Sequence, residues 1–196
     1  MKEHGLVFCP EMIQAFLDGH KTMTRRRMRP QPETVFNLPA FPRCPYSVGD
    51  LVYAKETVYV SPMYPFPHQY IRPTPKGQRL PPPPAPDDIV SRRGPWRLCA
   101  WGWRVFTNRF MPKAYARIWR KIVEVRPPER VQAISYEDIL SEGWDCRTSE
   151  PWGEKATAGQ DARAWWQTLW TRLHGPESWE ANPWVWPLVL GEKVQP

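Results

Sequence analysis

The chain has 196 residues and carries a formal net charge of +7, with a pI near 9.4. This length is typical of a single domain, and no stretch approaches the roughly 20 consecutive apolar residues that a membrane-spanning helix needs. The N-terminus has no uninterrupted apolar stretch of the kind found in a signal peptide, so we expect a cytoplasmic protein with no membrane partner. The positive charge favours a polyanionic partner such as nucleic acid.

The four cysteines are widely separated and include no C-x-x-C pair, and no histidine stands at ligand spacing. This pattern indicates neither a zinc site nor a disulfide framework. We therefore expect reduced thiols, no metal ion and no cofactor.

A short amphipathic helix is predicted at the N-terminus. Pro10 suits its first turn, and Gly19 suits the left-handed position after its last turn. The apolar residues of one face share helical spacing. They are Met12, Ile13, Phe16 and Leu17.

A dense polar segment follows this helix directly. Within seven residues it holds two hydroxyls and four cations, namely Lys21, Thr22, Thr24, Arg25, Arg26 and Arg27. Ammonium and guanidinium groups donate hydrogen bonds and accept none, so the segment suits an anionic or carbonyl ligand, with phosphate the obvious candidate. The alternative is a solvated basic strand whose threonines are ordinary strand formers.

A strand is predicted over residues 50–60, and in its alternation Glu56 shares a face with Val52 and Ala54. A carboxylate on an apolar face needs a partner. Glu56 either pairs with an arginine or meets a ligand if this face is covered, and it is a plain solvated glutamate if the face points outward.

Residues 61–97 are rich in proline and are predicted to form an extended insertion loop. Docking of this stretch to an SH3-like partner is an alternative, but no flanking pattern supports it. Strand-like sequence returns after Trp96 and again over residues 118–125.

A capping box, Ser135-x-x-Asp138, predicts a short helix that stops at Gly143. Glu142 then lies in the last turn, where a carboxylate opposes the helix dipole. Lys21 or an arginine of residues 25–27 is the candidate cation that would neutralise it, and the alternative is a solvated glutamate.

The last third of the chain predicts a packing helix over residues 161–173 and a closing strand over residues 184–190. Pro187 lies inside that strand. Because proline cannot donate to a ladder, it predicts an edge or a bulge at this point.

The polar segment resembles the G-x-K-x-x-x-x-R signature of the ASCH domain, a PUA-like β-barrel family associated with RNA and modified nucleosides, with Gly19, Lys21 and Arg26 at the signature positions. Further segments resemble phage and prophage members of that family in the same order. They are Cys44-Pro45-Tyr46, residues 48–57, Met111-Pro112-Lys113, residues 116–118, residues 124–126, residues 129–135, Glu137-Asp138, Ser141-Glu142-Gly143, Trp170, Gly175, Ser178-Trp179 and residues 182–186.

The resemblance implies an α+β fold, namely a single domain over residues 1–196 built as a PUA-like small β-barrel with flanking helices. It also implies an amidohydrolase that acts on 4-acetylcytidine or a related acylated cytosine nucleoside or base. In that chemistry Lys21 is the proton acceptor, Thr24 the nucleophile and Glu142 the proton donor.

The positions expected to bind the substrate are Gly19, Arg25, Arg26 and Glu56. Arginines 25–27 would lower the pKa of Lys21, and Arg26 would anchor the ligand or the developing oxyanion. Lys55 stands where the family pattern has arginine.

Two other functions remain open. The same cations suit a non-catalytic module that binds RNA or a modified nucleotide, and a metal-dependent ribonuclease is a third hypothesis that lacks a clear set of ligands. The partner is a nucleoside or nucleic acid in each case, and a monomer is favoured over an oligomer.

Overall fold

The computed structural model describes residues 1–35, 38–60, 70–71, 89–93, 96–99, 104–145 and 158–194. The chain divides into two compact units, which are treated separately below. Unit 1 consists of Met1 with residues 15–50 and 120–192, and unit 2 consists of residues 2–14, 51–119 and 193–196.

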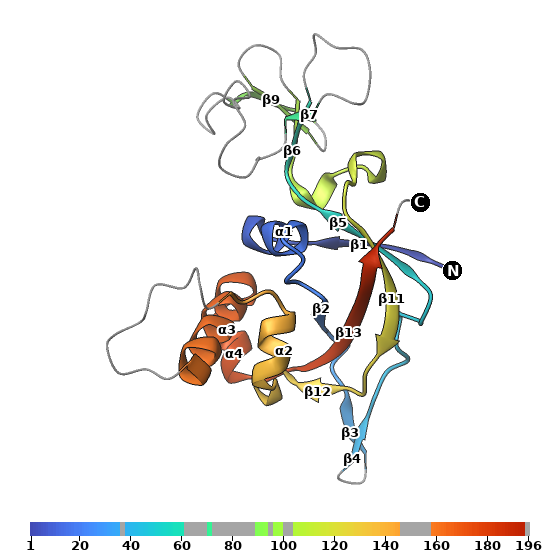
Figure 1. Ribbon diagram of the computed structural model, residues 1–196, viewed down its shortest axis with the longest axis vertical. Helices are drawn as coiled ribbons and strands as arrows, with labels where there is room; N and C mark the ends of the chain where they lie inside the picture. Colours follow the sequence, from blue (N-terminus) through green and yellow to red (C-terminus); the bar gives the residue numbers. More distant parts are fainter. Residues whose placement is uncertain are drawn as a thin grey trace. The chain divides into compact units, whose positions relative to one another are not determined.

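The centre of unit 1 is the long strand β13 (Trp184–Lys193). β2 (Met23–Arg27) pairs antiparallel with it, from Arg27 opposite Val185 to Met23 opposite Val189. β12 (Glu129–Arg130) pairs antiparallel with the start of β13, and β11 (Trp119–Val125) also lies beside it. These strands curl into part of a barrel wall (Figure 1). A small hairpin of β3 (Glu33–Val35) and β4 (Leu38–Ala40) completes the strands of unit 1.

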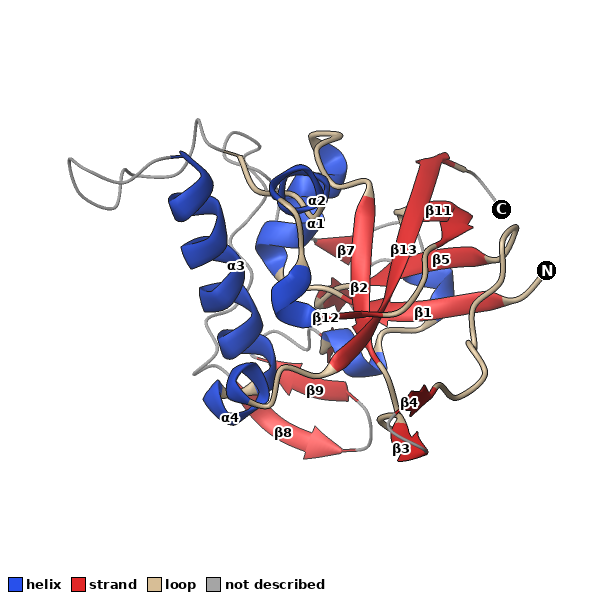
Figure 2. Cartoon of the chain, turned by 90° about the horizontal axis from the view of Figure 1, so that it is seen from below, coloured by secondary structure: helices blue, strands red, loops and turns tan. Residues whose placement is uncertain are grey.

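The helices of unit 1 are α2 (Tyr136–Ser141), α3 (Ala158–His174) and α4 (Pro176–Glu180). Figure 2 shows them together on one side of β2 and β13. Two tryptophans of α3 form hydrogen bonds to other parts of unit 1. The indole of Trp166 donates to the carbonyl of Val131 and that of Trp170 donates to the hydroxyl of Ser178, both at 3.1 Å. Among the helices that the structure describes, none is long and apolar enough to cross a membrane.

Unit 2 contains two sets of strands. β1 (Glu3–Val7) runs parallel to β5 (Leu51–Lys55), with Glu3 opposite Leu51. The second set is an antiparallel sheet in the order β7-β6-β10-β9-β8. Its strands are β6 (Val58–Val60), β7 (Tyr70–Ile71), β8 (Ile89–Arg93), β9 (Trp96–Cys99) and β10 (Arg104–Phe106).

The remaining helix, α1 (Pro10–Leu17), is the predicted N-terminal helix, and it begins at Pro10 as expected. The predicted packing helix is α3, which starts a few residues earlier than the pattern indicated. The predicted strand over residues 50–60 is divided into β5 and β6, on either side of Glu56. Mixed helices and strands with a curled half-barrel sheet confirm the predicted α+β class.

Most of the predicted proline-rich insertion, residues 61–97, lies outside the described residues. The parts of this range that the structure describes belong to β7, β8 and the beginning of β9.

The prediction that Pro187 marks an edge or a bulge was wrong. Pro187 lies inside β13, opposite Arg25, and the register with β2 is continuous through it. The carbonyl of Pro187 accepts a hydrogen bond from the backbone N–H of Arg126, just beyond the last residue of β11. Since N–H and C=O of one strand residue point the same way, the missing N–H faces the end of β11 and removes no hydrogen bond to β2.

Candidate functional site: a buried ion-pair network in unit 1

The turn after α1 directs Lys21 into the interior of unit 1. The backbone N–H groups of His20 and Lys21 both donate to the carbonyl of Ala15, at 2.9 and 3.0 Å. Gly19 makes this turn possible with a φ of +81°, a conformation that side-chain-bearing residues rarely adopt. The role of Gly19 in the structure is therefore to turn the chain.

The short helix α2 positions Glu142. As the capping box predicted, the Ser135 hydroxyl accepts from the backbone N–H of Asp138 at 3.1 Å. Gly143 ends the helix with a φ of +108°. The N–H of Glu142 donates to the carbonyl of Asp138 at 2.8 Å, so its side chain leaves directly from the last turn.

Lys21 and Glu142 form a direct ion pair in the interior. Lys21 Nζ lies 2.7 Å from Glu142 Oε2 and also donates to the Glu142 backbone carbonyl at 2.8 Å. Their side chains are 1% and 3% exposed. The sequence-based prediction that a cation neutralises Glu142 is therefore confirmed, although 121 residues separate the two.

Arg25 binds three carboxylates. Its Nε donates to Glu129 at 2.6 Å, its Nη2 to Asp138 at 2.5 Å, and its Nη1 to Glu142 at 3.3 Å. Burial works to lower the pKa of the Arg25 guanidinium, but the carboxylates of Glu142, Glu129 and Asp138 outweigh it and the net shift is upward. The guanidinium stays charged and holds the acidic side chains in place.

This arrangement changes the interpretation of Arg25. The sequence suggested a substrate-binding role, yet each of its three nitrogens already donates to a carboxylate within the protein. Arg126 extends the network, because its Nη1 donates to Asp138 Oδ1 at 2.9 Å. Glu129, Asp138 and Arg126 were not expected in the site, because no local pattern places residues 126–138 beside residue 25.

Thr24 and Arg26 lie on the other face of β2. Thr24 is opposite Leu188 and is 3% exposed, and strand alternation turns it away from the face of Arg25. In the described part of the chain, no hydrogen bond joins the Thr24 hydroxyl to Lys21 or Glu142. The structure thus brings two of the three predicted catalytic residues into contact.

Glu56 belongs to unit 2, where Arg117 occupies its carboxylate. Arg117 Nε and Nη2 donate to the two oxygens, both at 2.8 Å, and the Glu56 side chain is 4% exposed. The predicted arginine partner is therefore present. Arg117 therefore engages both oxygens of this carboxylate.

A cavity of about 260 Å³ lies between the segments that carry Lys21 and Glu142, although neither of these two residues lines it. Its lining includes the sequence neighbours of both partners: His20, Thr22, Leu140, Ser141, Trp144 and Asp145. His20 Nε2 lies 3.9 Å from Asp145 Oδ2. The cavity offers hydroxyl, imidazole and carboxylate groups together with apolar walls, which is typical of a site for a small polar ligand.

The second feature of unit 1 is a basic face that we define by Arg26, Arg27, Arg29 and His174. The ring of His174 packs 4.2 Å from that of Trp170. Desolvation of the covered part of the ring lowers the pKa of His174, and the charges of Arg27, Arg26 and Arg29 lower it further. The guanidinium groups of all three arginines therefore lie close enough to His174 to lower its pKa.

Within the part of the chain that the structure describes, His, Cys, Asp and Glu side chains form no group of three that could hold a metal ion. Neither Cys9 nor Cys44 forms a disulfide in the described part of the chain. Comparison of the chain with family models, curated proteins and solved structures found no match.

Proposed function

We propose that the chain hydrolyses the acyl amide of an acylated cytosine nucleoside or base, of the 4-acetylcytidine type. The proposal rests on the buried contact between Lys21 and Glu142, because the ASCH-like motifs assign the proton acceptor and the proton donor to these two residues. The same resemblance supports the proposal that the curled sheet is part of a PUA-like barrel.

The ion pair explains how a lysine and a glutamate could take these roles. In their usual ionised forms, the Lys21 ammonium has no lone pair to accept a proton and the Glu142 carboxylate has no proton to donate. Transfer of one proton over the 2.7 Å from Nζ to Oε2 produces an amine and a carboxylic acid, which are an acceptor and a donor.

In the proposed reaction, the Thr24 oxygen attacks the amide carbonyl and its proton passes to the Lys21 amine, a step that requires the Thr24 side chain to reach Lys21, with which it shares no hydrogen bond among the described residues. The C–N bond then breaks, and the proton of Glu142 goes to the departing exocyclic amine. Water hydrolyses the acyl-threonine to release the carboxylic acid and restore the hydroxyl. Arg26, on the same face of β2 as Thr24, is the candidate donor to the oxyanion.

The test is a chromatographic assay of the conversion of 4-acetylcytidine to cytidine. Thr24→Val removes the nucleophile without touching the ion-pair network, and Lys21→Met removes the acceptor. Both should lose turnover by at least about a hundredfold. Matched controls are Thr168→Val, on the exposed surface of α3, and Lys121→Met, an exposed lysine of β11. Wild-type turnover in Thr24→Val or in folded Lys21→Met would refute these roles.

A second candidate, binding of RNA or a modified nucleotide without bond cleavage, is favoured by the basic face. Arg130 and Trp184 form a cation–π pair with a guanidinium-to-ring distance of 4.6 Å. The arginines of the basic face lie near this pair along the chain, because the backbone N–H of Met28, between Arg27 and Arg29, donates to the carbonyl of Trp184. Cations beside a half-buried indole suit phosphates and a stacked base.

Salt-sensitive retention of RNA that is lost in an Arg27→Ala/Arg29→Ala variant, with no cytidine produced, would support this second function over hydrolysis. Loss of RNA integrity only with a divalent metal ion would instead support the ribonuclease hypothesis.

A further inference from the structure

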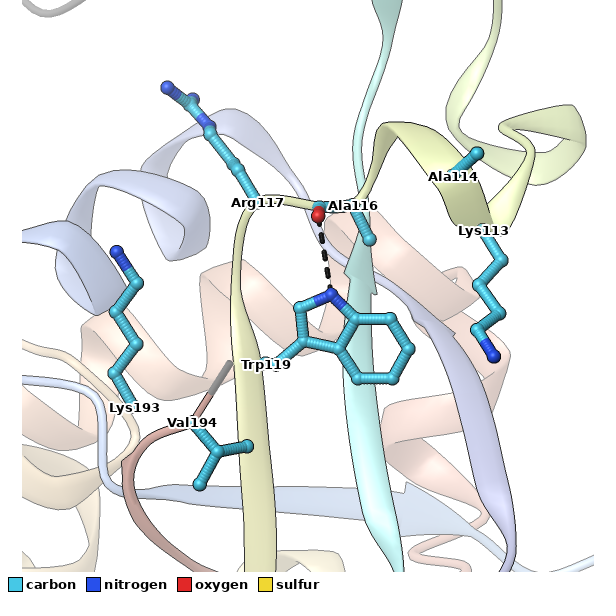
Figure 3. Close-up of a pocket in the computed structure, with 7 residues that line it drawn as sticks. All are labelled: Lys113, Ala114, Ala116, Arg117, Trp119, Lys193 and Val194. Atoms are coloured by element: carbon cyan, nitrogen blue, oxygen red, sulfur yellow. Dashed lines mark hydrogen bonds between the residues drawn. The ribbon is translucent and has the colours of Figure 1, made fainter. Parts of the chain in front are cut away.

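Unit 2 contains a cavity of about 460 Å³ that the proposed hydrolase chemistry does not use (Figure 3). Its lining combines three cations with apolar groups: Lys113, Ala114, Ala116, Arg117, Trp119, Lys193 and Val194. Among the residues that the structure describes, no acidic side chain lines this cavity. The cavity lies within the range of known small-molecule sites and is far larger than a bare phosphate requires.

The walls come from two chain segments that are fixed against each other. One runs from Lys113 to Trp119 and begins with the single turn of 3₁₀ helix at Lys113–Tyr115, and the other is the end of β13 with Val194. The backbone N–H of Val194 donates to the carbonyl of Trp119 at 3.0 Å. The Trp119 indole donates to the carbonyl of Ala116 at 3.2 Å and is 5% exposed, so it forms a fixed part of the wall.

The three cations differ in how far they are engaged. Lys113 bonds to Glu3 and its Nζ lies 5.5 Å from the Trp119 ring centroid. Arg117 uses Nε and Nη2 on Glu56, which leaves Nη1. Lys193 has no carboxylate partner among the residues that the structure describes.

Figure 3 shows Lys193 and Arg117 on one side of the Trp119 indole and Lys113 on the other. An ammonium and the outer nitrogen of a guanidinium are suited to a doubly charged oxyanion. The apolar walls beside them suit an uncharged organic group attached to that anion.

We propose that this cavity binds an organic phosphate of mononucleotide size. Lys193 and Nη1 of Arg117 hold the phosphate, and the nucleoside part lies against Ala116, Trp119 and Val194. The site belongs to unit 2 and is independent of the Lys21–Glu142 pair in unit 1.

The experiment is isothermal titration of the full chain with AMP, adenosine and inorganic phosphate at low ionic strength. AMP should bind at least about tenfold more tightly than either fragment, since each lacks one set of contacts. Equal affinity for AMP and adenosine would overturn the anion site, equal affinity for AMP and phosphate would overturn the nucleotide class, and no binding of AMP would overturn both.

Two variants test the location. Lys193→Glu should weaken AMP binding by about tenfold or more, because it replaces a charge-assisted hydrogen bond with a like charge. Ala114→Trp should also abolish binding by filling the cavity from an exposed lining position. Lys121→Glu, at an exposed lysine that does not line the cavity, is the control and should bind as the wild type does. Wild-type affinity in Lys193→Glu and Ala114→Trp would refute the assignment.

The result is separable from that of the hydrolase proposal. Thr24→Val should bind AMP with unchanged affinity, and Lys193→Glu should deacetylate 4-acetylcytidine at the wild-type rate. AMP binding that is lost in Thr24→Val would place the nucleotide in unit 1 and contradict the present assignment.

Discussion

The ammonium of Lys21 and the carboxylate of Glu142 contact each other at 2.7 Å, and neither side chain is more than 3% exposed. Burying two charges costs several kcal/mol per ion, which their attraction repays only with good geometry and further hydrogen bonds. Here the further bonds come from the Glu142 carbonyl and from Arg25. An apolar pair of similar volume would often be equally stable, so stabilisation alone does not explain why this ion pair is buried.

We predict that Lys21→Met lowers the free energy of unfolding by about 3 kcal/mol, because it leaves a buried carboxylate with Arg25 as its remaining cation. Glu142→Leu should have a similar effect, because it removes the carboxylate charge beside the buried ammonium of Lys21. The double variant Lys21→Met/Glu142→Leu should be less destabilised than the sum of the single changes, since it buries no unpaired charge. Urea denaturation followed by circular dichroism measures all three.

Lys121→Met is the control for this cycle and should stay within about 0.5 kcal/mol of the wild type, because Lys121 is exposed. Additive single changes would show that Lys21 and Glu142 do not interact in solution.

Gly143→Ala should be more harmful than Gly19→Ala, although both glycines have positive φ values. Each substitution adds about 1 kcal/mol of backbone strain. At Gly143 the new methyl group would also lie 2.8 Å from the Ala15 Cβ and 3.4 Å from the Lys21 Cβ, whereas nothing lies within 4 Å at Gly19. We therefore expect an additional loss of about 1–3 kcal/mol in Gly143→Ala, measured by urea denaturation.

Gly143→Ala should also reduce deacetylation, because the methyl group displaces Lys21, and Gly19→Ala should not. Equal stability of the two variants would mean that the helix end at Gly143 relaxes away from Ala15.

Local patterns predicted the parts of the site that depend on neighbouring residues. Pro10 and the capping residue Ser135 correctly predicted where two helices begin. The unfavourable position of Glu142 at a helix end predicted a neighbouring cation, which the structure shows to be Lys21. The three-way role of Arg25 could not be predicted, because its partners come from β12, α2 and the residue after α2. Pro187 was misjudged for a related reason, since the direction of its missing N–H depends on the strand beside it.

Glu56→Gln should destabilise the chain by about 1–3 kcal/mol and leave deacetylation of 4-acetylcytidine unchanged. Its carboxylate accepts two hydrogen bonds from Arg117, both at 2.8 Å, and the substitution replaces one acceptor by a donor. Arg117→Lys should also destabilise, because an ammonium cannot make the paired contact. Loss of turnover in Glu56→Gln at unchanged stability would restore the substrate-binding role that the sequence suggested.

The stability of the chain should depend on pH through His174. Its pKa in the folded chain is lowered from the ordinary value of 6.5 by desolvation against Trp170 and by the arginines of the basic face. Between the lowered pKa and 6.5, the unfolded chain binds a proton that the folded chain does not, so stability rises with pH across this window. The contribution of neutral His174 to the free energy of unfolding is therefore fully present above about pH 6.5, and it is lost as the pH falls through the lowered pKa.

Urea denaturation midpoints measured over this pH range should rise with pH in the wild type and rise less steeply in Arg27→Ala. In His174→Gln, the part of the rise that is due to His174 should be absent. A slope that survives unchanged in His174→Gln would assign the pH dependence to other groups.

RNA bound at the basic face would neutralise part of the arginine charge and raise the pKa of His174, so binding should be accompanied by proton uptake near pH 6. RNA binding without proton uptake would place the nucleic acid away from Arg26, Arg27 and Arg29.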